Sequence, residues 1–103
     1  MLHVIAIITA KPSQRERILE AIRANLPAVR AEKGCIEYGP AIDAAGIGPF
    51  QTLAGADAIF VIEKWADADA LKAHAAAPHM AAYAAKVKDL VASRVIHVLA
   101  SAE

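Results

Sequence analysis

Four short stretches of the chain have the hydrophobic pattern of β-strands, at residues 2–9, 35–40, 58–65 and 94–99. The first is β-branched and apolar almost without interruption from Leu2 to Ile8, which is typical of a strand buried on both faces. The second alternates with a period of two, and the third and fourth are rich in Val and Ile. Each of these patterns predicts a strand.

The segment after the first strand has the spacing of an amphipathic helix. Its apolar residues recur on one face at Ile18, Leu19, Ile22, Leu26 and Val29. Ser13 and Glu16 have the spacing of a capping box, in which each side chain binds a free backbone amide at the helix start. Pro27 should kink this helix, and Gly34 is placed to end it in a left-handed conformation.

A second helical region follows the third strand, and a proline divides it. Asp67 is a suitable N-cap for an alanine-rich helix through about Ala77, and Pro78 breaks that helix. A further helix is predicted from about His79 to Val91. Its apolar stripe contains Met80, Tyr83, Ala84, Val87 and Val91.

The resulting order, β-α-β-β-α-β, predicts an α+β fold of the ferredoxin-like type, as a single domain over residues 1–103. One four-stranded antiparallel sheet would carry the helices on one face. The other face would be bare, although the first, third and fourth strands are apolar on both faces. Because soluble monomers rarely expose a large apolar patch, we expect two such sheets to pack face to face in a homodimer.

Composition narrows the range of partners. The 11 basic and 11 acidic residues balance without a basic block, which argues against binding to nucleic acid or an anionic membrane. No apolar run reaches the roughly 18–20 residues that span a bilayer, and the run from Leu2 to Ile8 is too short for a secretory leader. Cys35 is the only cysteine, so no internal disulfide can form and a cytoplasmic location is expected.

Polar and aromatic side chains gather between residues 63 and 83 of an otherwise aliphatic chain, which suits a pocket for a flat, partly polar molecule. Glu63 and Trp65 are two apart on one strand and point to one face. The indole could form a wall for an aromatic ligand. Alternatively, Trp65 belongs to the core and Glu63 forms an ion pair at its rim.

Histidines and tyrosines are the candidate acid–base groups. His74 lies on the stripe that should face the sheet, either as a core histidine bonded to a carbonyl or as a general base, since imidazole titrates near neutral pH. His79 and Tyr83 are four apart and can touch, as a surface pair or as groups that orient a substrate oxygen. Tyr38 is either a core residue or a pocket residue, because a buried phenol needs a polar partner.

Motifs for metals and cofactors are absent. No His-x-x-x-His pair shares a helix, and no acid stands at a metal-ligand spacing nearby. The Gly46–Pro49 segment lacks the third glycine and the βαβ setting of a dinucleotide site. We therefore expect neither a metal nor a cofactor.

At these residues the chain resembles the antibiotic biosynthesis monooxygenase superfamily, and within it the small bacterial quinol monooxygenases. The resemblance runs nearly end to end and rests on Gly34-Cys35-x-x-Tyr38, Phe50-Gln51, Glu63-x-Trp65, Ala73-His74 and Pro78-His79-Met80-x-x-Tyr83. It implies a dimeric α/β barrel and oxygen chemistry on electron-rich aromatics without flavin, haem or metal. The candidate catalytic residues are His74, His79 and Tyr83, and the candidate substrate contacts are Trp65, Tyr38, Met80 and Glu63.

Two departures from the superfamily restrict this expectation. Ile5, Ala6 and Ile7 stand where many relatives have a polar residue in the first strand, so no base is expected there. In the haem-degrading branch, a tryptophan corresponds to His74 and a histidine to Ala84, so haem degradation is not expected.

The functional hypothesis is a cofactor-independent monooxygenase or oxidase that acts on quinols with O₂. Two alternatives remain. One is a non-oxidative enzyme of the isomerase type on the same scaffold, and the other is a non-catalytic, stress-associated dimer that binds quinones. Fold alone does not separate them, because one scaffold can host several activities.

Overall fold

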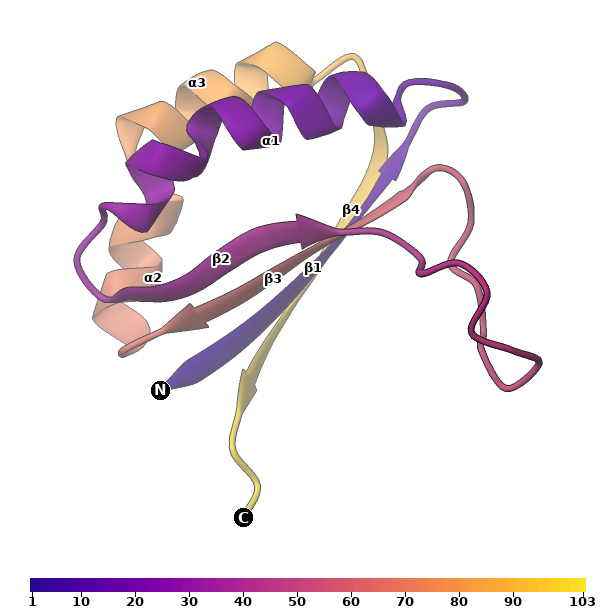
Figure 1. The fold of residues 1–103 in the computed structure, drawn as a ribbon. Helices are drawn as coiled ribbons and strands as arrows, with labels where there is room; N and C mark the ends of the chain where they lie inside the picture. The colour runs from indigo at the N-terminus through magenta and orange to yellow at the C-terminus, as the bar shows by residue number, and fades with distance from the viewer.

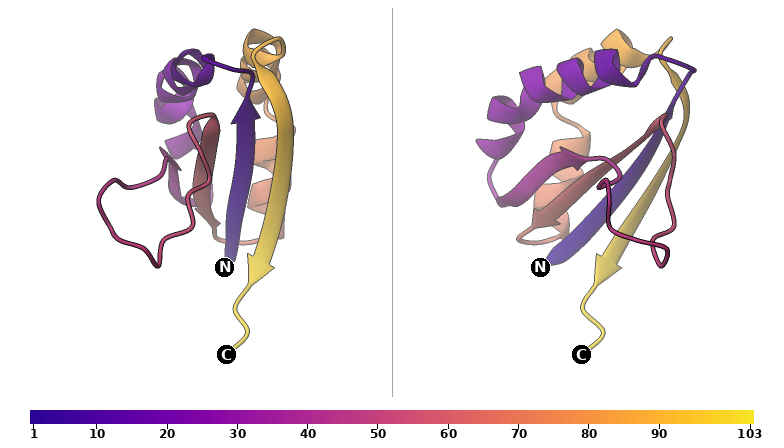
Figure 2. Two further views of the ribbon diagram at one scale, coloured as in Figure 1. Left: turned by 90° about the vertical axis from the view of Figure 1, so that its right-hand side faces the viewer. Right: turned by 45° about the vertical axis from the view of Figure 1, so that its right-hand side comes forward.

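The computed structural model describes residues 1–103. Its elements are β1 (Leu2–Ala10), α1 (Arg15–Arg30), β2 (Cys35–Ala41), β3 (Ala58–Trp65), α2 (Ala68–Ala75), α3 (Pro78–Val87) and β4 (Val91–Ala100). The strands form one antiparallel sheet in the order β2-β3-β1-β4, and the helices lie on one side of it (Figure 1, Figure 2). This is the predicted ferredoxin-like arrangement, with its second helix divided into α2 and α3.

β1 lies in the middle of the sheet, between β3 and β4. Val4, Ala6 and Ile8 point toward the helices and are at most 6% exposed. Ile5 and Ile7 alternate with them, point to the other face and are only half-buried. The sequence predicted burial on both faces of β1, but a single chain buries only the face toward the helices completely.

The uncovered face of the sheet is apolar. Ile62 on β3 and Val95 and Leu99 on β4 lie on this face and are 41%, 49% and 46% exposed. β4 is also an edge strand, so nothing in the chain covers its outer side. The sheet thus has the exposed apolar face that its sequence predicted.

α1 packs on the sheet through the stripe that the sequence predicted. Ile18, Leu19, Ile22 and Val29 are each at most 4% exposed, and Leu26 packs at the edge of the same cluster. Burying an aliphatic side chain of this size stabilises the fold by roughly 1.5–3 kcal/mol. This stripe is therefore a main source of the attachment of α1 to the sheet.

The start of α1 differs from the predicted capping box. The helix begins at Arg15, and Gln14 occupies the N-cap without a side-chain hydrogen bond. Ser13 has a φ of 66° and belongs to the preceding turn, in which the Gln14 amide donates to the Lys11 carbonyl at 3.0 Å. Glu16 instead pairs with Arg23 at 2.9 Å. The box was wrong because Ser13 belongs to this turn and Gln14 occupies the N-cap position instead.

The turn between α1 and β2 is built around Gly34. α1 ends at Arg30 and runs through Pro27, so Gly34 does not terminate the helix as predicted. Its φ of 83° is left-handed, as expected, and a Cβ at this position would lie 2.5 Å from the Cβ of Ala70 on α2. Only glycine therefore allows both this backbone conformation and this close approach of α2.

α2 and α3 meet at Pro78. Asp67 caps α2 as predicted, with Oδ1 accepting from the Ala70 amide at 2.8 Å. Pro78 is at the first position of α3, where its missing amide hydrogen costs nothing. α3 ends at Val87, so the prediction that Val91 belongs to its stripe was wrong. A turn in which the Leu90 amide donates to the Val87 carbonyl at 2.8 Å leads directly into β4.

The segment between β2 and β3 projects away from the sheet and the helices (Figure 1). Asp43 holds it together, because its two carboxylate oxygens accept from the amides of Ala54 and Gly55 at 3.1 and 2.9 Å. These hydrogen bonds lower the pKa of Asp43.

No helix of the chain is both long enough and apolar enough to cross a membrane.

The contact at Gly34 gives a stability prediction. Gly34→Ala should lower the free energy of unfolding by about 3 kcal/mol, because the left-handed backbone costs an alanine about 1 kcal/mol and the overlap with Ala70 adds about 2 kcal/mol. Gly46→Ala is the matched control, since Gly46 has a φ of 71° but no atom within 4 Å of an added Cβ. Chemical denaturation of both variants measures the difference. Equal losses would show that the approach of α2 is not tight.

Candidate functional site

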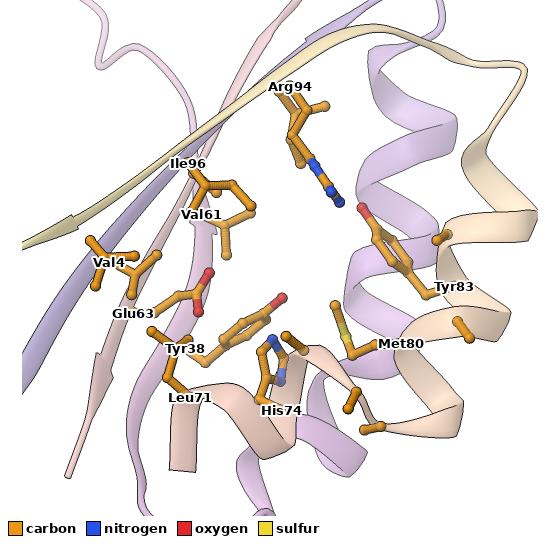
Figure 3. Close-up of a pocket in the computed structure, with 18 residues that line it drawn as sticks. Val4, Tyr38, Val61, Glu63, Leu71, His74, Met80, Tyr83, Arg94 and Ile96 are labelled. Carbon is orange, nitrogen blue, oxygen red and sulfur yellow. The ribbon is translucent and has the colours of Figure 1, made fainter. Parts of the chain in front are cut away.

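An apolar cavity of about 420 Å³ lies between the sheet and helices α2 and α3 (Figure 3). All four strands and both helices contribute to its walls, and Val4, Val61, Leu71, Met80 and Ile96 supply much of the apolar surface. Pockets for small molecules have volumes of roughly 300–1,000 Å³ and mostly apolar walls. The cavity therefore suits one small, largely apolar ligand.

Five side chains bring polar atoms to this cavity. Figure 3 shows Tyr38, Glu63 and His74 together near α2, and Arg94 pointing toward the hydroxyl of Tyr83 farther along the cavity. Tyr38 and Glu63 are neighbours because their strands pair at these two residues. The cavity thus has two polar regions separated by apolar wall.

His74 is held by a carboxylate. It is 6% exposed, and its Nδ1 lies 2.7 Å from Oε2 of Glu32, in the turn after α1. Because a carboxylate only accepts hydrogen bonds, Nδ1 carries the proton and donates it. When the ring is neutral, Nε2 therefore has a free lone pair on a side chain that lines the cavity. The partner expected for a core histidine, a backbone carbonyl, is not what binds this ring.

His79 does not line the cavity, in contrast to the expected contact with a substrate. Its Nε2 lies 3.3 Å from Oε1 of Glu32, so its ring contacts the carboxylate oxygen that His74 does not. Its Nδ1 is buried without a hydrogen-bond partner. The expectation failed because the first turn of α3 directs His79 toward the α1–β2 turn, whereas Tyr83 on the same helix reaches the cavity.

Trp65 is also placed differently from the expectation that its indole stacks on a ligand. It is fully buried, at 0% exposure, and its Nε1 donates to Oε1 of Glu63 at 2.9 Å. Its ring packs on His74, with 4.6 Å between ring centroids. Trp65 therefore supports two cavity side chains from behind, as the core alternative predicted, but Glu63 bonds the indole and forms no ion pair.

Burial controls the charge of the cavity groups. Desolvation raises the pKa of Glu63, and the hydrogen bond from Trp65 and the electrostatic influence of the nearby His74 ring only partly oppose it. Desolvation also raises the pKa of Tyr38, with the nearby Glu63 adding to the effect. The pKa of Tyr83 is raised by burial and lowered by Arg94. Both phenols therefore stay neutral at physiological pH and can donate hydrogen bonds.

The open side of the cavity lies along β4. Ile96 and Val98 line the cavity, yet each is 51% exposed, so the helices cover the β1 and β3 part of this face more fully than the β4 part. No group of three or more His, Cys, Asp or Glu side chains is arranged to hold a metal ion.

Sequence reasoning missed Glu32 and Arg94. Arg94 carries a detectable signal, because it is a charged residue in an apolar strand and lies on the same face as Ile96 and Val98. Glu32 carries none, since it lies in a turn outside any periodic pattern. Its role depends on α2 and α3, which are 42 and 47 residues away at His74 and His79.

The buried carboxyl of Glu63 gives a pH prediction. Because its pKa is raised in the folded state, the folded protein retains a proton that the unfolded chain releases, so this contribution to stability is lost as the pH rises through the folded-state pKa. Glu63→Gln keeps an acceptor for Trp65 and removes the ionisation. Its melting temperature relative to the parent protein should therefore increase from about pH 4 to neutral pH.

Glu20→Gln is the control, because Glu20 is exposed on α1. Its melting temperature relative to the parent should change little over the same range. If the melting temperatures of Glu63→Gln and the parent changed in parallel with pH, burial would not be raising the pKa of Glu63.

Comparison with known proteins bears out the resemblance. The sequence profile of the family described as antibiotic biosynthesis monooxygenase matches residues 1–86. An Escherichia coli K12 protein with the name "Probable quinol monooxygenase YgiN" is 40% identical over 101 residues, 96% of each chain. The solved structure of PA3566 from Pseudomonas aeruginosa has 27% identity, a TM-score of 0.80 and coverage of 99% of this chain and 94% of its own. Rv0793 from Mycobacterium tuberculosis has 26% identity, a TM-score of 0.80 and coverage of 99% and 95%.

The profile covers most of the chain, and the Escherichia coli relative matches it nearly end to end. The two proteins are also similar in length, since the match covers 96% of each. This chain belongs to the antibiotic biosynthesis monooxygenase family.

Proposed function

We propose that this protein is a cofactor-independent oxygenase that acts on quinols or related electron-rich aromatics with O₂. The observation that carries the proposal is the contact between Nδ1 of His74, a cavity side chain, and Oε2 of Glu32 at 2.7 Å. This contact leaves Nε2 of a neutral His74 ring free to accept a proton. Membership of a monooxygenase family and a relative named for quinols support the choice of reaction and substrate.

The proposed role of His74 is to take a proton from the substrate. A hydroquinone is already electron-rich, and its phenolate transfers an electron to O₂ far more readily than the neutral phenol. In the monooxygenase outcome, one oxygen atom of O₂ enters the ring and the other leaves as water, so that hydroquinone and O₂ give hydroxyquinone and water. The quinol supplies all the electrons and protons. In the oxidase outcome, the quinol gives quinone and O₂ gives hydrogen peroxide.

The other polar groups of the cavity suit a ligand with more than one oxygen atom. Glu63 is held by Trp65 through Oε1, so its second oxygen is available to accept from a substrate hydroxyl. Tyr38 is a neutral donor beside it. At the far end, Tyr83 and Arg94 could stabilise negative charge on a second substrate oxygen. His79 and Trp65 act in this scheme by holding groups that line the cavity.

The same proposal includes a homodimer. The uncovered face of the sheet exposes Ile62, Val95 and Leu99, and a second copy packed on this face would bury them. The proposed location is the cytoplasm, because the chain has a single cysteine and so no internal disulfide.

The base is tested by oxygen uptake of purified, metal-free protein with hydroquinones and anthrones, after subtraction of spontaneous oxidation. His74→Ala should lower the substrate-dependent rate by roughly 10²–10⁴-fold, the usual effect of losing a positioned acid–base group. Lys72→Ala is the control, because Lys72 is exposed on the same helix. A folded and fully active His74→Ala protein would contradict the assignment. Ligand binding without any oxygen uptake by the parent protein would favour the isomerase or binding alternatives.

The dimer is tested by light scattering coupled to size-exclusion chromatography. Val95→Asp places a charge on the uncovered face, on strand β4, and should convert a dimer of the parent into monomers. Ala24→Asp adds the same charge on an exposed position of α1 and should leave the assembly unchanged. A parent protein that elutes as a monomer at high concentration would refute this part of the proposal.

A further inference from the structure

Glu32 lies outside the cavity but is rigidly placed. Its side chain is 17% exposed, and its backbone is held on both sides in the α1–β2 turn. Its amide donates to the Val29 carbonyl at 3.0 Å, and its carbonyl accepts from the Cys35 amide at 3.1 Å. The carboxylate therefore meets α2 and α3 as a fixed group, not as a mobile surface side chain.

The two oxygens of Glu32 are divided between two imidazole rings. Oε2 binds Nδ1 of His74 at 2.7 Å, and Oε1 binds Nε2 of His79 at 3.3 Å. A carboxylate can accept from both rings at once because both of its oxygens are hydrogen-bond acceptors. A glutamine amide could accept from one ring only, and the other ring would have to turn its lone pair toward the NH₂ group.

We propose that Glu32 is a positioning residue that holds His74 as the Nδ1–H tautomer and keeps the proton taken from the substrate on His74 instead of His79. This inference rests on the proposed function. The tautomer leaves Nε2 of His74 free to accept the phenolic proton, and the negative charge of Glu32 stabilises the imidazolium that forms.

The surroundings of His79 explain why the proton stays on His74. Nδ1 of His79 is buried without a partner, so a proton added there would be a buried, unpaired N–H group on a charged ring. The proton on Nε2 of His74, in contrast, faces the cavity and the substrate oxygen that released it. His79 thus remains a neutral donor that fixes the second oxygen of Glu32.

The charged and titratable groups that face His74 come from four elements. They are Glu32 in the α1–β2 turn, Glu63 on β3, Tyr38 on β2 and, through Glu32, His79 on α3. Tyr38 is neutral because burial raises its pKa. Removal of the Glu32 charge should therefore make the imidazolium less stable, so the acidic limb of the rate profile should move to lower pH.

The first test reads the tautomers without any substrate. The chain has only four histidines, so long-range ¹H–¹⁵N correlation spectra of protein labelled on histidine can be assigned with His74→Ala and His79→Ala. The parent protein should show His74 protonated on Nδ1 and His79 on Nε2. In Glu32→Gln at least one of these rings should change tautomer. Glu20→Gln, an exposed glutamate on α1, should leave both rings unchanged.

The second test uses substrate-dependent oxygen uptake as a function of pH. Glu32→Gln should lower kcat by roughly 10²-fold, at the low end of the effect of losing the base itself, with KM changed less than kcat. The acidic limb should move to lower pH. Glu32→Asp restores the carboxylate with a shorter reach and should recover part of kcat and most of the pH profile. Glu32→Asp also tests the role of Glu32 if Glu32→Gln does not fold.

The outcomes separate this inference from the proposed function. Parental tautomers of both rings in Glu32→Gln, or an unchanged pH profile with unchanged kcat, would overturn the role of Glu32. If the parent protein takes up no oxygen, the proposed function fails, and the tautomer spectra still decide whether Glu32 holds His74. A folded Glu32→Asp protein no more active than Glu32→Gln would also count against the positioning role.

Discussion

The close contact between α2 and the turn at Gly34 is the constraint on which the site depends. A Cβ on Gly34 would lie 2.5 Å from Ala70, so the absence of a side chain lets α2 approach the turn directly. Glu32 is two residues before Gly34, and His74 is one helical turn after Ala70. The contact between two small residues therefore sets the 2.7 Å hydrogen bond between Glu32 and His74.

The apolar walls of the cavity give its few polar groups their properties. The β-sheet places Tyr38 and Glu63 side by side through strand pairing, and the same face carries only aliphatic residues on β1. Burial raises the pKa of the Glu63 carboxyl, and Trp65 holds this carboxyl in place. Electrostatic interactions are stronger in such surroundings than in water, and the two phenols remain donors. An otherwise apolar cavity can thus bind an oxygenated ring in one orientation.

Much of the fold could be predicted from the sequence because its patterns are local. The bounds of β3 were predicted correctly, since an unbroken Val- and Ile-rich run is followed by a capping aspartate. The errors occurred where tertiary contacts decide the local geometry. Ser13 lies in a turn and forms no capping box, and Val91 is the first residue of β4 and not part of α3. In both places a competing backbone hydrogen bond outweighed the local preference.

By itself, the sequence determined the β-α-β-β-α-β order, the amphipathic face of α1, the apolar sheet and the polar cluster around His74, because each follows from periodicity or from residue type. Only the tertiary structure decided which of these polar groups meet. It turned His79 and Trp65 away from the cavity and brought in Arg94, and it joined Glu32 to two histidines more than 40 residues away. Such contacts leave no periodic signal, because they arise when three separate elements pack on one another.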